Sequence, residues 1–197
     1  MKKTLSKNFF QKIISFLSVR PERSTISVRS RMGLAKFIFC LSLSWFFALC
    51  SQIIIPLPFN LVPVSLQPLP LFSLSLLIGW PAVYAYLLTI FQTALGAPFF
   101  SGFQGGIVKL LGPTGGYIFG FAVAMIFLAI LRNKKNNLPF LFLKLLCTNI
   151  IVFTFGLLQL CLFVPYQKLF ILGLYPFIFG DMLKTIIIMF IIHNIKR

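Results

Sequence analysis

Acidic side chains are nearly missing from this chain: its 197 residues include 18 lysines and arginines but only two acids, Glu22 and Asp181. Only 10% of the residues are charged, whereas soluble domains average about 25%. The sequence also lacks a C-x-x-C pair, a cluster of metal-ligating residues and a G-x-x-x-x-G-K-[ST] phosphate loop. These absences exclude a soluble domain, a metal centre of the common kinds and ATP hydrolysis by such a loop. The four cysteines are far apart and are expected to be free thiols.

Hydrophobic residues make up 59% of the chain, and most lie in long runs after residue 36. A helix needs about 20 apolar residues to cross the hydrocarbon layer of a membrane. The stretch 61–97 is ambiguous, since it has room for one span or for two short spans that divide at Gly79-Trp80-Pro81, where glycine and proline break a helix. The other runs predict one span each: 37–55, 114–131, 139–163 and 174–194.

The positions of the basic residues resolve this ambiguity. Nine lie in residues 1–36, three in 132–135, and two more end the chain. Because lysine and arginine mark the cytoplasmic side, an even number of crossings must separate residue 36 from residue 132, and 61–97 must supply two of them. We therefore predict an all-α integral membrane protein with six transmembrane helices and both termini in the cytoplasm.

The first 36 residues are expected to form a separate basic segment ahead of a membrane domain at 37–197. Apolar residues recur every four positions near its start, which is typical of a basic amphipathic helix on the inner membrane surface. The alternative is a disordered basic tail. The repeating residues are Leu5, Phe9, Ile13 and Leu17.

Glycine punctuates the segment 101–121, "SGFQGGIVKLLGPTGGYIFGF". Gly112, Gly116, Gly120 and Ala124 follow one another every four residues, a spacing that lets helix backbones approach closely. The earlier glycines suggest instead a loop that lies close over another part of the molecule. Free N–H groups at the helix start near Thr114 also offer a place for a carboxylate.

Asp181 stands inside the apolar run "YPFIFGDMLKTIIIMF" with Lys184 three residues later. The two side chains share one helix face, so they can form a structural ion pair. A buried ion pair is seldom more stabilising than apolar residues, however, and ionisable groups within a membrane usually line a cavity or pathway. A carboxylate that accepts N–H groups beside an amine that donates to a carbonyl would match a neutral, amide-like ligand.

Four stretches, in this order, resemble BioY, the substrate-binding S component of the biotin energy-coupling-factor (ECF) transporters. They are "IPLPFNLVPVSLQPL" (55–69), "LGAPFFSGFQGG" (95–106), "LGPTGGYIFGF" (111–121) and "FGDMLK" (179–184). The resemblance implies a six-helix S-component bundle in a bacterial cell membrane that binds biotin from the outer side. It implies transport with a membrane coupling protein and two ATPase subunits, without a cofactor of its own and without covalent chemistry.

The resemblance also implies roles for individual residues. Asp181 and Lys184 take the positions of the family's acid and lysine, which suit the two N–H groups and the carbonyl of biotin's ureido ring. Some members carry an arginine after "GGY" that suits the biotin carboxylate; this chain has Ile118 there, which leaves Lys109 or the helix start at Thr114 as substitutes. The remaining implied binding residues are Gln67, Gln104 and Tyr117.

A stripe of small residues in the first helix, Cys40, Ser44 and Ala48, resembles the surface through which the family docks its coupling protein. Packing within the chain explains the stripe equally well. Three other functions stay open: an S component for a different vitamin, a membrane enzyme that uses Asp181 as a general base, and a structural subunit.

Overall fold

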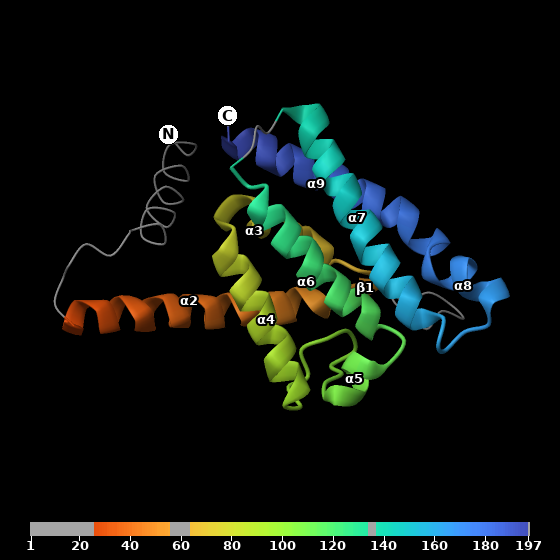
Figure 1. Ribbon diagram of the computed structural model, residues 1–197, viewed down its shortest axis with the longest axis horizontal. Coiled ribbons are helices and arrows are strands. Elements are labelled where there is room, and N and C mark those ends of the chain that lie inside the picture. The colour runs from red at the N-terminus through yellow and green to blue at the C-terminus, as the bar shows by residue number, and fades with distance from the viewer. Residues whose placement is uncertain (1–25, 56–63, 134–136, 197) are drawn as a thin grey trace.

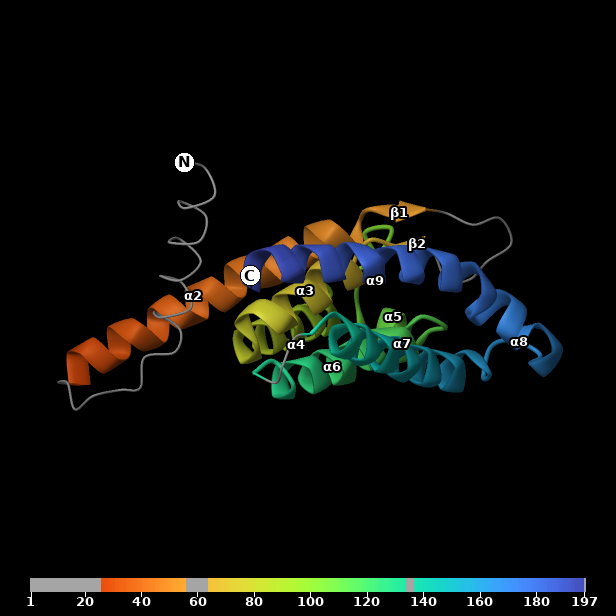
Figure 2. The same cartoon turned by 90° about the horizontal axis from the view of Figure 1, so that it is seen from above.

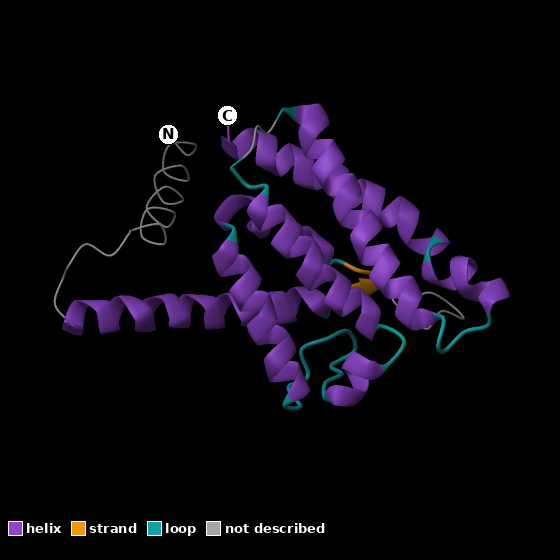
Figure 3. Ribbon diagram, in the orientation of Figure 1, coloured by secondary structure: helices purple, strands orange, loops and turns teal. Residues whose placement is uncertain are grey.

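The computed structural model describes residues 26–55, 64–133 and 137–196, and most of these lie in helices (Figures 1 and 3). A two-residue antiparallel pair joins β1 (Ile54–Ile55) to β2 (Val64–Ser65). The predicted amphipathic helix near the N-terminus lies outside the described residues. The helices are α2 (Ile26–Ser51), α3 (Pro68–Ile78), α4 (Trp80–Ala94), α5 (Ile107–Leu111), α6 (Gly115–Ile130), α7 (Leu138–Leu160), α8 (Tyr166–Gly173) and α9 (Tyr175–Lys196).

Three segments of the described chain are long and apolar enough to cross a membrane: Gly33–Ser51, Leu138–Leu160 and Tyr166–Ile195. Helices α3 and α6 are apolar but shorter. At a rise of 1.5 Å per residue, the 11 residues of α3 extend about 16 Å, roughly half of the hydrocarbon layer. The all-α membrane fold is confirmed, while the number of six crossings and the location of the termini stay predictions.

The predicted break at Gly79 is present and separates α3 from α4. Gly79 has a φ of +72°, in the left-handed region that favours glycine, and Pro81 lies in the first turn of α4. The guanidinium of Arg132 donates to the Ile78 carbonyl at 3.0 Å, so the turn after α6 lies at the same end of the molecule as this break. Six crossings with both termini in the cytoplasm would place both of these turns on the cytoplasmic side, and the contact agrees with that prediction.

Helix α3 occupies the centre of the bundle. Seen from above, α2 and α9 lie on one side of it, and α6 and α7 lie on the other (Figure 2). Leu71 and Leu76 of α3 are completely buried, as is Met125 of α6. Because α3 is short and largely buried at the centre, the space at its N-terminal end can be reached from α6, α7 and α9.

The glycines of α6 bring it into close contact with α7. A Cβ atom on Gly116 would collide with the Phe155 carbonyl oxygen, and one on Gly120 would come within 3.0 Å of the Val152 Cα. Ala124, in the same row, is fully buried. The small-residue spacing therefore reflects close packing of the two helices.

The structure corrects the docking role of the small-residue stripe in α2. Ser44 and Ala48 are 0% and 5% exposed, because α4 covers them. The Ser44 hydroxyl hydrogen-bonds Thr89 at 3.0 Å, and the Cys40 thiol donates to the Pro81 carbonyl at 3.7 Å. Ser44 and Ala48 pack inside the chain and Cys40 is partly buried, so internal packing explains the stripe and these two side chains are not available to a partner.

Helix α2 begins at Ile26, so the predicted boundary between 36 and 37 falls inside one continuous helix.

All four cysteines lie in the described part of the chain and are free thiols, as expected.

Candidate ligand-binding site

A cavity opens between the central helix and the helices around it. The space between its walls, with the open solvent at its mouth included, is about 540 Å³. Its walls come from β2, α3, the loop after α4, and helices α5, α6, α7 and α9. The lining residues are Ser65, Gln67, Pro68, Phe100, Ser101, Lys109, Thr114, Tyr117, Ile118, Phe121, Val152, Phe153, Phe177, Asp181 and Lys184.

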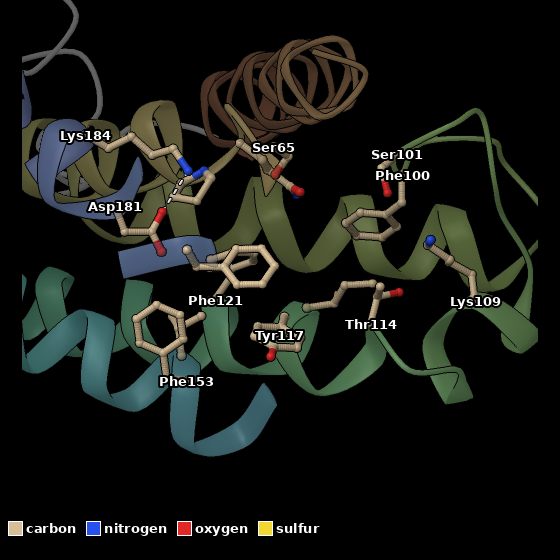
Figure 4. A pocket seen from close by; sticks show the side chains of 15 residues that line it. Ser65, Phe100, Ser101, Lys109, Thr114, Tyr117, Phe121, Phe153, Asp181 and Lys184 are labelled. Atoms are coloured by element: carbon tan, nitrogen blue, oxygen red, sulfur yellow. Dashed lines mark hydrogen bonds and ion pairs between the residues drawn. The ribbon is translucent and has the colours of Figure 1, made fainter. Parts of the chain in front are cut away.

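Asp181 and Lys184 form one polar end of this cavity (Figure 4). The Lys184 Nζ lies 2.7 Å from the Asp181 Oδ1, and the two side chains are only 10% and 13% exposed. Within the described segments, this bond uses one carboxylate oxygen and one of three ammonium protons. The pair is thus an ion pair and part of the cavity wall, and the second carboxylate oxygen, with two lone pairs, and two ammonium protons remain for a ligand.

Gln67 adds an unsatisfied donor to the same cavity. It precedes α3, is 4% exposed, and its side-chain Nε2 has no hydrogen-bond partner among the residues that the structure describes. A buried amide without a partner costs about 1–3 kcal/mol. A ligand oxygen placed in the cavity would remove that cost.

Lys109 marks the opposite end of the cavity (Figure 4). Its Nζ donates to the Gln104 Oε1 at 2.7 Å, and burial lowers the pKa of the Lys109 amine below its ordinary value. Thr114 lines the same end and is 9% exposed. Gln104 is exposed and does not line the cavity. Its contact is with the cavity residue Lys109.

The start of α6 offers less to an anion than its sequence suggests. The Gly115 N–H donates to the Gly112 carbonyl at 3.0 Å. The space beside Gly115 is filled by the Leu110 carbonyl and the side-chain amide of Gln159. Lys109 is therefore the better partner for a carboxylate.

Aromatic rings form the wall between the two polar ends. The Tyr117 ring lies 5.9 Å from that of Phe177, which in turn lies 6.5 Å from that of Phe153. The Tyr117 hydroxyl donates to the Gly173 carbonyl at 2.7 Å. That bond occupies the hydroxyl proton and joins α6 to the junction of α8 and α9, so Tyr117 offers the cavity mainly its ring.

Six of the seven predicted binding residues thus line one cavity, and Gln104 is the exception. Nine further lining residues were not predicted as ligand contacts: Ser65, Pro68, Phe100, Ser101, Ile118, Phe121, Val152, Phe153 and Phe177. Ser65 and Ser101 lie within two of the quoted motifs, and their place in those motifs is the signal by which the sequence marks them. Phe100 and Phe121 also lie within quoted motifs, but residue type alone does not single them out, because the chain has 25 phenylalanines.

The fold is that of a solved S component. The chain superposes on "the S-component for biotin from an ECF-type ABC transporter" with a TM-score of 0.70, covering 88% of this chain and 94% of that one at 22% identity. Among curated relatives, the probable biotin transporter BioY of Pyrococcus horikoshii is 36% identical over 126 residues, which are 63% of this chain and 74% of the relative. The biotin transporter BioY of Thermotoga maritima is 30% identical over 73% of this chain and 86% of its own length.

The sequence model of the BioY family matches residues 22–197. The chain belongs to the BioY family, and it is a multi-pass protein of the cell membrane.

Proposed function

We propose that this protein is the biotin-binding S component of an ECF-type transporter, which captures biotin from the outer side of the membrane. Its relatives are named biotin transporters, and its fold is that of an S component. The observation that carries the proposal is the chemistry of the cavity: a buried Asp181–Lys184 pair at one end, aromatic walls, and Lys109 at the other.

Biotin has the matching sequence of groups. Its ureido ring presents two N–H groups and one carbonyl, its thioether ring and aliphatic chain are apolar, and its chain ends in a carboxylate. In the proposed pose, Asp181 accepts from the ureido N–H groups, while Lys184 and Gln67 donate to polar atoms of the ring. The carboxylate then lies toward Lys109, and the aromatic residues enclose the apolar part.

Transport rather than catalysis follows from the family. The cavity pairs its single carboxylate with a lysine that neutralises it, which suits binding better than general-base catalysis. ATP enters this scheme only through partner subunits, and we propose a membrane coupling protein and two ATPases as those partners. Ser44 and Ala48 of α2 are buried and are not part of their docking surface.

Equilibrium binding of labelled biotin to the purified chain in lipid nanodiscs tests the proposal. Asp181→Asn keeps the shape of the side chain but removes its charge and leaves Lys184 unpaired. Hydrogen bonds to charged groups contribute about 1.5–3 kcal/mol, so affinity should fall by about 10- to 100-fold. Met182→Leu, at an exposed position of the same helix, is the matched control.

The alternative of a different vitamin is tested in the same assay. Unlabelled thiamine, riboflavin and lipoate should fail to displace labelled biotin. Affinity that is unchanged in the Asp181→Asn protein, or displacement by one of these other vitamins, would reject the assignment.

A further inference from the structure

The loop that follows α4 closes one end of the cavity. We call residues 95–113 the lid; it contains α5 and contributes Phe100, Ser101 and Lys109 to the cavity wall. Its backbone folds back on itself, since Phe100 and Gln104 exchange two hydrogen bonds of 3.2 Å. The lid thus forms a compact wall at the Lys109 end of the cavity.

The C-terminal end of α4 holds the lid through backbone hydrogen bonds. The N–H groups of Gly96 and Gly106 both donate to the Thr93 carbonyl, at 2.9 and 2.7 Å. Gly105 packs directly against the backbone of Ala97, where a Cβ atom would collide with the carbonyl oxygen. These contacts hold the part of the lid next to α4 as one compact piece. Whether the lid can open therefore depends on its contacts with the other helices.

Gln52, at the end of α2, makes the first of these contacts. Its side-chain Nε2 donates to the Phe100 carbonyl at 3.1 Å, and its Oε1 accepts from the Phe103 N–H at 3.0 Å. Phe103 has a φ of +54°, which is unfavourable for a residue with a side chain. The neighbouring Ser51 hydroxyl donates to the Phe99 carbonyl. One glutamine thus bonds a backbone carbonyl, which also accepts from the Gln104 N–H, and a backbone N–H of the turn that carries Phe100 and Ser101 into the cavity.

Gln159, on α7, makes the second of these contacts. Its side-chain Nε2 donates to the carbonyls of Leu110 and Gly112, at 3.2 and 2.8 Å, just after Lys109. Gly115 and Gly116 make room for it: a Cβ on Gly115 would lie 2.6 Å from the Gln159 Nε2, and one on Gly116 would lie 2.7 Å from the Gln159 Cβ. The glycines of "GPTGGY" therefore serve the contact between Gln159 and the lid as well as the packing of α6.

Neither glutamine lines the cavity, yet each holds the stretch of lid that contributes cavity residues. We infer that Gln52 and Gln159 are positioning residues that fasten the lid over the bound ligand and thereby set the rate at which the ligand leaves. The inference rests on the proposed function for the identity of the ligand, but the closure of the lid can be measured without any ligand.

The test replaces each glutamine by methionine, which has a similar length and no polar group. Each variant loses the amide's hydrogen bonds to the lid, which corresponds to roughly tenfold easier opening. We expect the dissociation rate of labelled biotin, chased with unlabelled biotin, to rise about tenfold in Gln52→Met and in Gln159→Met. Because the two sites lie on separate helices, the effects should multiply in the double variant. Gln167→Met, at an exposed position of α8, is the control.

Trypsin provides a second readout that needs no ligand. Lys109 is the single lysine or arginine in the lid, and Lys168 is an exposed lysine on α8 that serves as an internal reference. Cleavage after Lys109 should be faster in both glutamine variants, while cleavage after Lys168 and the melting temperature stay at the values of the Gln167→Met protein. Biotin should slow cleavage after Lys109 in the unmodified protein.

The outcomes separate the inference from the proposed function. Dissociation and cleavage rates equal to those of the control would overturn the role of the glutamines, even if biotin binds as proposed. A parallel rise in cleavage at Lys168 would also overturn it, because the glutamines would then stabilise the whole fold. If biotin does not bind at all, the proposed function fails, while faster cleavage at Lys109 alone would still support a fastened lid.

Discussion

Replacing Lys109 by methionine should weaken the binding of biotin but not of biotinamide, in which the carboxylate is a neutral amide. Lys109 lines the cavity at the end opposite the Asp181–Lys184 pair, and its amine now donates to Gln104 at 2.7 Å. A ligand carboxylate would replace or share that neutral acceptor. The predicted effect is therefore the difference between a charged and a neutral acceptor for one ammonium donor.

The size of this effect follows from the burial of Lys109. Two unit charges 4 Å apart interact with about 4 kcal/mol at an effective dielectric constant of 20, before the cost of removing water from both. Hydrogen bonds to charged groups contribute about 1.5–3 kcal/mol net, and the lost bond to Gln104 reduces this. We expect a loss of about 1.5 kcal/mol, or roughly tenfold in affinity, for biotin.

The assay is a cycle of two proteins and two ligands, measured by competition against labelled biotin. Lys109→Met should lower the affinity for biotin about tenfold and leave that for biotinamide within about twofold. Lys168→Met, at an exposed position on α8, should change neither. An equal loss for both ligands would show that Lys109 acts through the shape of the lid and not through its charge, which would refute the reasoning.

Three further predictions concern the same cavity and its frame. Burial lowers the pKa of Lys109, so its charge is lost at a lower pH than that of an ordinary lysine. The affinity for biotin should therefore fall as the pH rises through that pKa. Lys109→Arg should move this fall to higher pH. Gln67→Met should weaken biotin binding several-fold yet raise the melting temperature of the empty protein, because it removes an unpaired buried amide; a lower melting temperature would contradict this. Gly116→Ala should destabilise the fold by about 1–3 kcal/mol, because its Cβ meets the Phe155 carbonyl. Gly33→Ala, where the Cβ meets nothing, should not destabilise it. Equal melting temperatures of the two variants would count against the α6–α7 contact.

Much of the fold could be predicted because a membrane restricts what a sequence can do. Long apolar runs and the clustering of basic residues gave the helices, and Gly79 with Pro81 gave the break between α3 and α4. The short length of α3 could not be predicted in the same way. Hydropathy reports that a segment is apolar, but not whether lipid or the rest of the protein surrounds it.

The candidate site was predictable where its residues are unusual. Asp181 and Lys184 stand out in an apolar helix, and the cavity brings Gln67 and Lys109 into the same space. Gln52 and Gln159 carried no such signal, because their role is to bond backbone atoms 46–51 residues away in the sequence. The stripe at Ser44 shows the converse problem: small residues favour close packing, but the sequence alone does not say against which helix.

An experimental structure of the complex with biotin would test the proposed binding mode directly, because it would show the orientation of biotin in the cavity. Two cationic groups, Lys184 and Lys109, are available to a carboxylate, so two opposite orientations compete. We predict that the ureido ring lies within hydrogen-bond distance of Asp181 and the carboxylate lies at Lys109. A carboxylate bound to Lys184, with the ureido ring under the lid, would contradict it.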